Sequence, residues 1–245
     1  RWDAIEEHSK WFQDLNQRLR YSTKPVVTAP HGYTLGGGAE IAMAGDAIQA
    51  HADLTMGLVE TGVGIIPGAG GTLQLLRKVL GDHADDKSVD PMPFIEQVFG
   101  QIRKGRMSKS ADQAASAGYL DAGDRVMLNA DHLLHAAKQR VLSLAEGGYR
   151  PPLPTRFRLP GPDGFAVFDA QMHNWLEAGG ISEHDRTIWR KLAGVLCGGE
   201  TSPRRTISED RMLELEREAF VSLSGEEKSR ERMRHMLEHG RRLKN

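Results

Sequence analysis

The sequence predicts an α/β domain that is followed by a mostly α-helical region. Three observations predict this arrangement. Short β-branched or apolar runs alternate with helical periodicity in the first half, glycine-rich turns join them, and only helical periodicity follows a proline-rich segment. Eleven of the 27 glycines fall between Gly32 and Gly71, so we expect the functional site in that window.

The first half alternates between helical and extended segments. Residues 2–21 predict an amphipathic helix, with Trp11 beside an apolar stripe of Ile5, Phe12, Leu15 and Leu19. The elements that follow are a buried strand over 26–29, a glycine turn leading into a helix at 41–44, strands over 46–50 and 54–56, and a helix over 72–79.

The second half is dominated by helical periodicity. Helices are expected over 93–118, 131–146, 165–178, 183–197, 209–223 and 226–239, with Ser182, Ser208 and Ser224 as N-caps. Five of the 11 prolines lie between Gly147 and Gly164, which disfavours both helix and strand pairing there. We therefore expect an α/β domain over residues 1–146, a proline-rich linker over 147–164 and a helical C-terminal region over 165–245.

Composition excludes several classes of protein. A chain of 245 residues can bury a sizeable core, and 32 Lys plus Arg nearly cancel 33 Asp plus Glu. With positive and negative charges nearly balanced, the protein has no overall positive potential that would attract the phosphate backbone of a nucleic acid. We therefore expect no nucleic-acid partner. The single cysteine, Cys197, excludes an intrachain disulfide and a cysteine-based zinc site. No apolar run is long enough to cross a bilayer, so we expect no membrane span and a cytoplasmic location.

The chain starts at Arg1, without a methionine and already within helical periodicity. Proteins rarely begin inside an element. We therefore expect this sequence to be the C-terminal part of a longer protein, with further chemistry encoded upstream.

The first candidate for chemistry is the run Gly36, Gly37 and Gly38 followed by Glu40. A glycine turn into a helix leaves backbone amides unpaired in a positive dipole field, where they could stabilise an oxyanion. A tight strand-to-helix packing turn explains the same residues and is favoured when they are considered alone.

A second carboxylate, Glu60, follows Glu40 by 60 − 40 = 20 residues, beyond the two short strands. Both acids lie among small and apolar residues, an environment that favours a raised pKa and a shared proton. Such a pair suits proton transfer to and from a water molecule. The alternative is that Glu40 occupies the first turn of a helix only because acids are favoured there, and that Glu60 is exposed to solvent. The spacing of the two acids leaves both interpretations open.

Two nucleotide-binding motifs are rejected. Residues 62–67 fail the dinucleotide pattern at its last glycine, and no lysine follows Gly70 and Gly71 as a phosphate-binding loop requires.

Several histidines and the cysteine are expected to be structural. His235 and His239 fit an H-x-x-E-H zinc pattern, but only six residues follow them in a strongly charged helix, so no metal site is predicted. His132 and His135 lack a third partner. His31 is expected to cap its turn, and Cys197 to be a small buried thiol.

Three motifs carry a resemblance to a known family. They are KPVVTAPHGYTLGGGAE at 24–40, GLVE at 57–60 and IPGAGGT at 66–72. In this order and at this spacing they closely resemble the enoyl-CoA hydratase/isomerase (crotonase) family over about residues 5–80. Segments at 149–152, 181–185, 195–199 and 226–245 resemble the end of long bacterial fatty-acid oxidation proteins, which carry a 3-hydroxyacyl-CoA dehydrogenase module first and the hydratase module last.

The resemblance implies a fold and roles for five residues. The fold would be a partial crotonase-like ββα superhelix whose N-terminal strands are missing. The amide of Gly37 would polarise the thioester carbonyl, and Glu40 and Glu60 would add water across a trans-2-enoyl-CoA. Gly36 and Gly68 would position substrate or water. The second oxyanion amide and most of the CoA-contacting loop would lie upstream of this chain.

The resemblance also implies an activity and partners. Hydration is favoured because the family's isomerases usually keep only the acid that matches Glu60. The alternatives are an isomerase or thioesterase of the same fold, and a non-catalytic module for binding a CoA thioester or for assembly. The substrate would be an acyl-CoA, with no cofactor in this chain and NAD only in an upstream dehydrogenase module. A homo-oligomer, or packing against that module, is expected.

Overall fold

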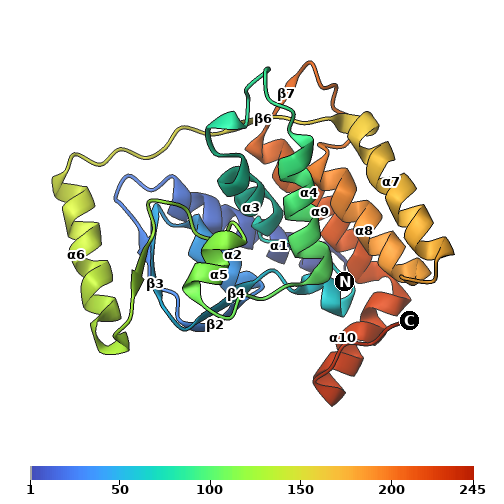
Figure 1. Cartoon of the computed structure of the whole chain (residues 1–245), viewed down its shortest axis with the longest axis horizontal. Helices are drawn as coiled ribbons and strands as arrows, with labels where there is room; N and C mark the ends of the chain where they lie inside the picture. Colours follow the sequence, from blue (N-terminus) through green and yellow to red (C-terminus); the bar gives the residue numbers. More distant parts are fainter. Residues whose placement is uncertain (1) are drawn as a thin grey trace.

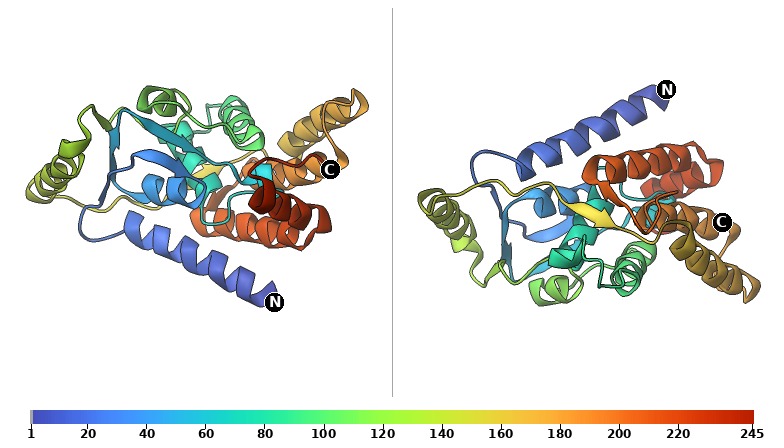
Figure 2. Two further views of the ribbon diagram at one scale, coloured as in Figure 1. Left: turned by 90° about the horizontal axis from the view of Figure 1, so that it is seen from below. Right: turned by 90° about the horizontal axis from the view of Figure 1, so that it is seen from above.

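The structure is a computed structural model that describes residues 2–245, and it begins with a 19-residue helix, α1 (Trp2–Arg20). In Figure 2 this helix (blue) runs along one side of the molecule, and it packs against the late helix α9 (Glu209–Gly225). A helix from the start of the chain therefore packs against a helix from near its end.

Parallel strands form the α/β part. β1 (Val27–Thr28) pairs with β3 (Ala47–His51), which also pairs with β5 (Arg125–Met127). β2 (Gly32–Leu35) pairs with β4 (Leu54–Gly57). The turn expected near Gly32 therefore continues into a strand. Pairing with β4 supplies hydrogen bonds that local propensity does not indicate.

Short helices connect these strands and carry the site. They are α2 (Gly37–Ala44), the 3₁₀ turn η1 (Glu60–Val63) and α3 (Gly71–Leu80), which continues into η2 (Gly81–His83). α2 begins directly after β2, and η1 begins three residues after β4. The ends of two paired parallel strands thus bring Glu40 and Glu60 to the same edge.

The helix predicted over 93–118 is in fact two helices. α4 (Met92–Lys104) ends at Gly105, and α5 (Ala111–Ser116) begins after Ser110, whose hydroxyl accepts the Gln113 amide. The loop between them runs beside β4, where the Ser108 amide donates to the Met56 carbonyl at 2.8 Å. Gly105, in the left-handed conformation with φ 51°, caps α4, and the contact at Ser108 then holds the following loop against β4.

The later helices lie at the two sides of the molecule in Figure 1, with α6 alone at the left and α7 to α10 at the right. They are η3 (Ala130–His132), α6 (Leu133–Glu146), α7 (Gly161–Glu177), α8 (Glu183–Leu196), α9 and α10 (Glu227–His239). Ser182 and Ser208 cap α8 and α9 as predicted. Ser224 instead lies in the last turn of α9, where its hydroxyl donates to the Phe220 carbonyl.

Part of the predicted linker is ordered as a strand. β6 (Arg156–Arg158) pairs antiparallel with β7 (Thr206–Ser208), because these three residues contain no proline and their backbone groups are free to pair. α7 also starts inside the predicted linker, at Gly161. One hydrophobic core runs from Leu58 and Leu76 to Leu196 and Met212, so the C-terminal helices share the core of the α/β part.

Among residues 2–245, no helix combines the length and apolar character that spanning a membrane requires.

The most deeply buried side chains of α1 are polar. Its apolar stripe is only half buried, whereas Ser9, Gln13 and Asn16 are buried. The Ser9 hydroxyl donates to the Gly68 carbonyl at 2.6 Å, and the Asn16 amide donates to the Ala69 carbonyl at 2.8 Å. This helix therefore holds the glycine-rich loop before α3 by hydrogen bonds.

Replacing Ser9 with alanine is expected to lower the free energy of unfolding by about 1–3 kcal/mol, because the buried Gly68 carbonyl loses its donor. Urea denaturation measures this change. The matched control Glu7→Ala, on the exposed face of α1, should change it by less than about 0.5 kcal/mol. An equal loss in both variants would contradict the assigned contact.

Candidate functional site

The turn at Gly36 and Gly37 lies at the centre of the candidate site. Gly36 has φ 54° and ψ −124°, a backbone conformation that side chains disfavour, and its amide donates to the Gly57 carbonyl at 2.9 Å. Gly37 starts α2, and its amide has no acceptor among residues 2–245. An unpaired donor is therefore presented at this turn.

Glu40 lies in the first turn of α2 and is 3% exposed. Its Oε1 accepts the amides of Ala69 at 2.9 Å and of Gly71 at 2.7 Å. A Cβ on Gly71 would lie only 2.7 Å from the same oxygen, so glycine is required for this approach. The two amides fix the position of the carboxylate and favour its ionised form.

Glu60 begins η1 and points toward the same turn. Its Oε1 lies 3.2 Å from where a Cβ on Gly36 would be, and Glu40 Oε2 lies 4.0 Å from the equivalent position on Gly37. Both carboxylate oxygens of Glu60 are buried and have no hydrogen-bond partner among the described residues. A buried, unpartnered carboxylic acid is costly, and such groups in native structures often have a functional reason.

Glu216 is a third buried carboxylate, which the sequence analysis did not identify. It reaches the glycine-rich loop from α9, where its Oε1 accepts the Gly70 amide at 2.6 Å and its Oε2 accepts the Thr72 amide at 2.8 Å. The amides of residues 69 to 72 therefore alternate between Glu40 and Glu216. The loop is held from both sides.

Burial raises the pKa of all three acids. It raises the pKa of Glu60 to about 7, with a further contribution from the charge of Glu216, while the nearby amides of Val59 and Glu60 oppose the shift. Burial also raises the pKa of Glu216 to about 7. The pKa of Glu40 is well above its usual range, first because of burial and then because of the charges of Glu60 and Glu216. The site therefore retains protons near neutral pH.

The remaining predicted site residue, Gly68, packs against α9. A Cβ on Gly68 would lie 2.6 Å from the Phe220 ring, and its carbonyl accepts the Ser9 hydroxyl. Phe12 of α1 lies on the other side of the site, 3.1 Å from where a Cβ on Gly37 would be. The structure thus gathers Gly36, Gly37, Glu40 and Glu60 at one turn and places Gly68 in the adjoining loop.

Glu216 carried a sequence signal that could have identified it. The buried stripe of α9 includes Met212, Leu213, Ala219 and Leu223, and Glu216 occupies a helical position between them. A carboxylate on an apolar stripe requires a buried partner. The sequence alone does not say which partner that is.

The histidines and the cysteine that were expected to be structural are not among the residues gathered at the candidate site. The rings of His235 and His239 stack with centroids 4.3 Å apart, and residues 2–245 contain no cluster of three or more side chains suited to a metal ion. Burial raises the pKa of the Cys197 thiol to about 12. The His31 carbonyl accepts the Thr34 hydroxyl at 3.3 Å.

Replacing Glu216 with alanine is expected to lower the free energy of unfolding by about 3 kcal/mol or more, because two buried amides lose their acceptor and a cavity opens. Chemical denaturation at neutral pH measures the loss. Glu218, an exposed residue on the same helix, supplies the control Glu218→Ala, which should stay within about 0.5 kcal/mol of the parent. A loss no larger than that of the control would refute the role of Glu216 in holding the loop.

Comparison with known proteins supports this reading of the sequence. Residues 4–87 match the profile of the family described as enoyl-CoA hydratase/isomerase. A Bacillus subtilis protein named "Probable 3-hydroxyacyl-CoA dehydrogenase" is 43% identical over 234 residues, which are 96% of this chain and 29% of that protein. A Rickettsia felis protein named "Putative fatty acid oxidation complex trifunctional enzyme" is 27% identical over 230 residues, covering 94% of this chain and 28% of that protein. The chain thus spans less than a third of the length of either relative.

The fold has solved counterparts. An enoyl-CoA hydratase from Mycobacterium avium subsp. paratuberculosis K-10 aligns with a TM-score of 0.55 and 16% identity, over 94% of this chain and 70% of that one. This likeness confirms the predicted crotonase-like fold and, at this identity, concerns the fold alone. Residues 4–87 are thus similar in sequence to the enoyl-CoA hydratase/isomerase family, and mostly helical structure follows them in this chain.

Proposed function

We propose that this chain is the enoyl-CoA hydratase portion of a fatty-acid β-oxidation enzyme, which adds water to a trans-2-enoyl-CoA to give a 3-hydroxyacyl-CoA. One observation carries the proposal. Two buried carboxylates, Glu40 and Glu60, flank one glycine turn, and only Glu40 accepts hydrogen bonds from backbone amides. This asymmetry suits a pair in which one member holds a proton and the other is ionised.

The proposed roles follow from the two environments. Glu40, held in place by the amides of Ala69 and Gly71, accepts a proton from water as the water oxygen bonds to C3. Because burial and the charges of Glu60 and Glu216 raise the pKa of Glu40, it can take this role only in the state of the pair in which the one retained proton is on Glu60. Glu60 is the protonated member and gives its proton to C2, next to the thioester carbonyl. The water oxygen forms the new C–O bond and the C2=C3 double bond is lost. Proton exchange between the acids or with water then restores the starting state.

Negative charge develops on the thioester oxygen while water adds. The unpaired amide of Gly37, at the positive end of α2, is suited to donate to that oxygen. A second donor would come from strands upstream of this chain, so we propose that the complete site is assembled in the longer protein. Gly36 and Gly68 would shape the path of the substrate and the water.

We further propose that the longer protein carries an NAD-dependent 3-hydroxyacyl-CoA dehydrogenase module, because the 3-hydroxyacyl product is the substrate of such an oxidation. The B. subtilis relative's name supports this, and the chain covers less than a third of that relative. NAD would be bound by the upstream module. Within this chain, the amides of the glycine-rich loop at residues 69–72 already serve two carboxylates and do not form a cradle for phosphate.

Substituting either acid tests the roles directly. Glu40→Gln and Glu60→Gln are each expected to lower kcat for hydration by about 10²–10⁴-fold, with a smaller change in KM, because a proton-transfer group is lost. The rate is followed by the loss of ultraviolet absorbance of the conjugated enoyl thioester, with this chain and with the longer protein. Glu218→Gln, on the exposed part of α9, serves as the control.

Three results would contradict the proposal. An unchanged rate in both variants would remove the assigned roles. Thioester binding without turnover by the longer protein would favour a non-catalytic binding module. Product that retains a shifted double bond, with no hydroxyl group, would favour an isomerase.

The pH dependence of hydration is predicted from Glu60. Because its pKa is about 7 and the protonated form donates, kcat/KM is expected to fall as the pH rises above about 7. Glu216→Gln removes a charge that raises the pKa of Glu60, so the fall should begin at lower pH. A pH profile of kcat/KM for the parent, Glu216→Gln and the control Glu218→Gln measures this. A shift toward higher pH in Glu216→Gln would contradict the electrostatic link.

A further inference from the structure

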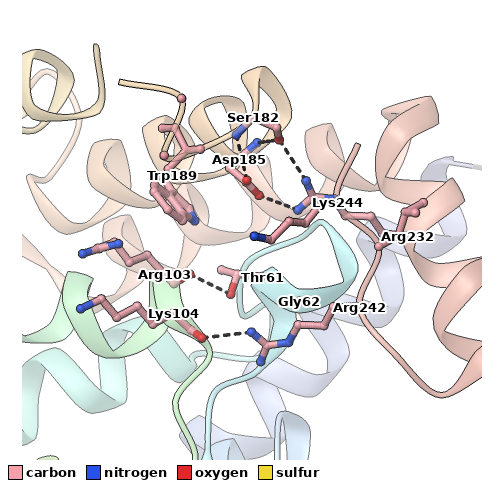
Figure 3. Close-up of a pocket in the computed structure, with 14 residues that line it drawn as sticks. Thr61, Gly62, Arg103, Lys104, Ser182, Asp185, Trp189, Arg232, Arg242 and Lys244 are labelled. Carbon is pink, nitrogen blue, oxygen red and sulfur yellow. Dashed lines mark hydrogen bonds and ion pairs between the residues drawn. The ribbon is translucent and has the colours of Figure 1, made fainter. Parts of the chain in front are cut away.

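A basic cavity of about 590 Å³ lies next to the candidate site. Thr61 and Gly62, which directly follow Glu60, form part of its wall. The end of α4, the start of α8 and the segment after α10 form the rest, as Figure 3 shows. This volume is in the range of pockets that hold small molecules.

Positive charge is in large excess in this cavity. Its cationic side chains are Arg103, Lys104, Arg232, Arg242 and Lys244, and its one acidic side chain is Asp185. Asp185 is already paired with Arg232 at 2.8 Å. Among residues 2–245, the other four cations have no carboxylate within ion-pair distance.

The cations are held in place by neutral groups. The Arg103 guanidinium lies 4.4 Å from the ring centre of Trp175 and 5.0 Å from that of Trp189. Arg242 donates to the carbonyls of Lys104 at 3.1 Å and Gly105 at 3.0 Å. These contacts position the guanidinium groups without neutralising them.

The C-terminal segment fits closely against this wall. A Cβ on Gly62 would lie 2.7 Å from Arg242 Nε, and one on Gly105 would lie 2.6 Å from an Arg242 terminal nitrogen. The Asn245 side chain accepts a hydrogen bond from Arg232 at 2.7 Å. The docked C-terminal segment therefore forms one wall of the cavity, which remains partly open to solvent.

Mutual repulsion of the cations contributes to lowered pKa values at Lys104 and Arg103. The pKa of Lys104 is lowered, first because of the charge of Arg103. Burial lowers the pKa of Arg103, and Arg106 adds to the effect. A bound anion would relieve this repulsion and would gain several charge-assisted hydrogen bonds.

We propose that this cavity binds a small molecule that carries a diphosphate group, with the phosphate oxygens among Arg103, Lys104 and Lys244. Four unneutralised cations match the charge of a diphosphate better than that of a single carboxylate. The volume also leaves room for more than the phosphates. The group could belong to a free nucleotide or to the CoA of an acyl-CoA, which carries the same chemistry.

Isothermal titration of the 245-residue chain with inorganic pyrophosphate tests the proposal. Lys104→Gln and Lys244→Gln should each weaken binding about fivefold, and the double variant about 25-fold, because each removes one charge near the anion. The control Lys87→Gln lies in an exposed loop and should bind like the parent. Unchanged melting temperatures would show that the variants are folded.

Titration with ADP and with CoA then distinguishes the two sources. Because CoA itself contains an ADP group, losses in the two pocket variants for CoA assign the cavity to the substrate's carrier, an outcome that rests on the proposed function. Losses for ADP, with no binding of CoA by the parent, assign it to a free nucleotide. Two results would overturn the proposal. One is no pyrophosphate binding by the parent at millimolar concentration. The other is equal losses in Lys87→Gln and the pocket variants, which would indicate general charge attraction only.

Discussion

Four consecutive backbone amides hold the candidate site together by donating hydrogen bonds to two buried glutamates. Those of Ala69 and Gly71 donate to Glu40, and those of Gly70 and Thr72 donate to Glu216. The loop therefore cannot move without breaking charge-assisted hydrogen bonds on both sides. Because Glu216 comes from α9, the C-terminal helices are part of the arrangement that positions Glu40.

This constraint explains why two neighbouring acids can differ. Glu40 accepts hydrogen bonds from two loop amides, whereas Glu60 has only the nearby amides of Val59 and Glu60 and no hydrogen-bond partner, although both acids are buried beside one turn. A single proton shared unequally by the pair is the simplest consequence, since two ionised carboxylates at short range repel each other. The unpaired Gly37 amide lies at the same turn, so the proposed proton transfer and the proposed oxyanion stabilisation would act on one substrate.

Sequence reasoning located the site but missed part of its support. The motifs around Glu40 and Glu60 are local, and parallel pairing of β2 with β4 brings the two acids together, which their spacing alone had left open. Glu216 is far away in the chain, so only packing reveals its partner. The polar stripe of α1 was missed because Ser9 contacts a backbone carbonyl, which leaves no pattern in the sequence. The break after α4 occurs at Gly105, a left-handed C-cap, so a local sequence signal for it was present and was missed.

An NMR titration of the side-chain carboxyl carbons tests the unequal pair most directly, with the Glu40 and Glu60 signals assigned through their glutamine variants. The account predicts that the Glu60 carboxyl titrates at about pH 7. It also predicts that this midpoint moves to lower pH when Glu216 is replaced by glutamine. Titration of Glu60 near 4.5, the ordinary value for a glutamate, would contradict the account, because Glu60 itself would then hold no proton to deliver at neutral pH.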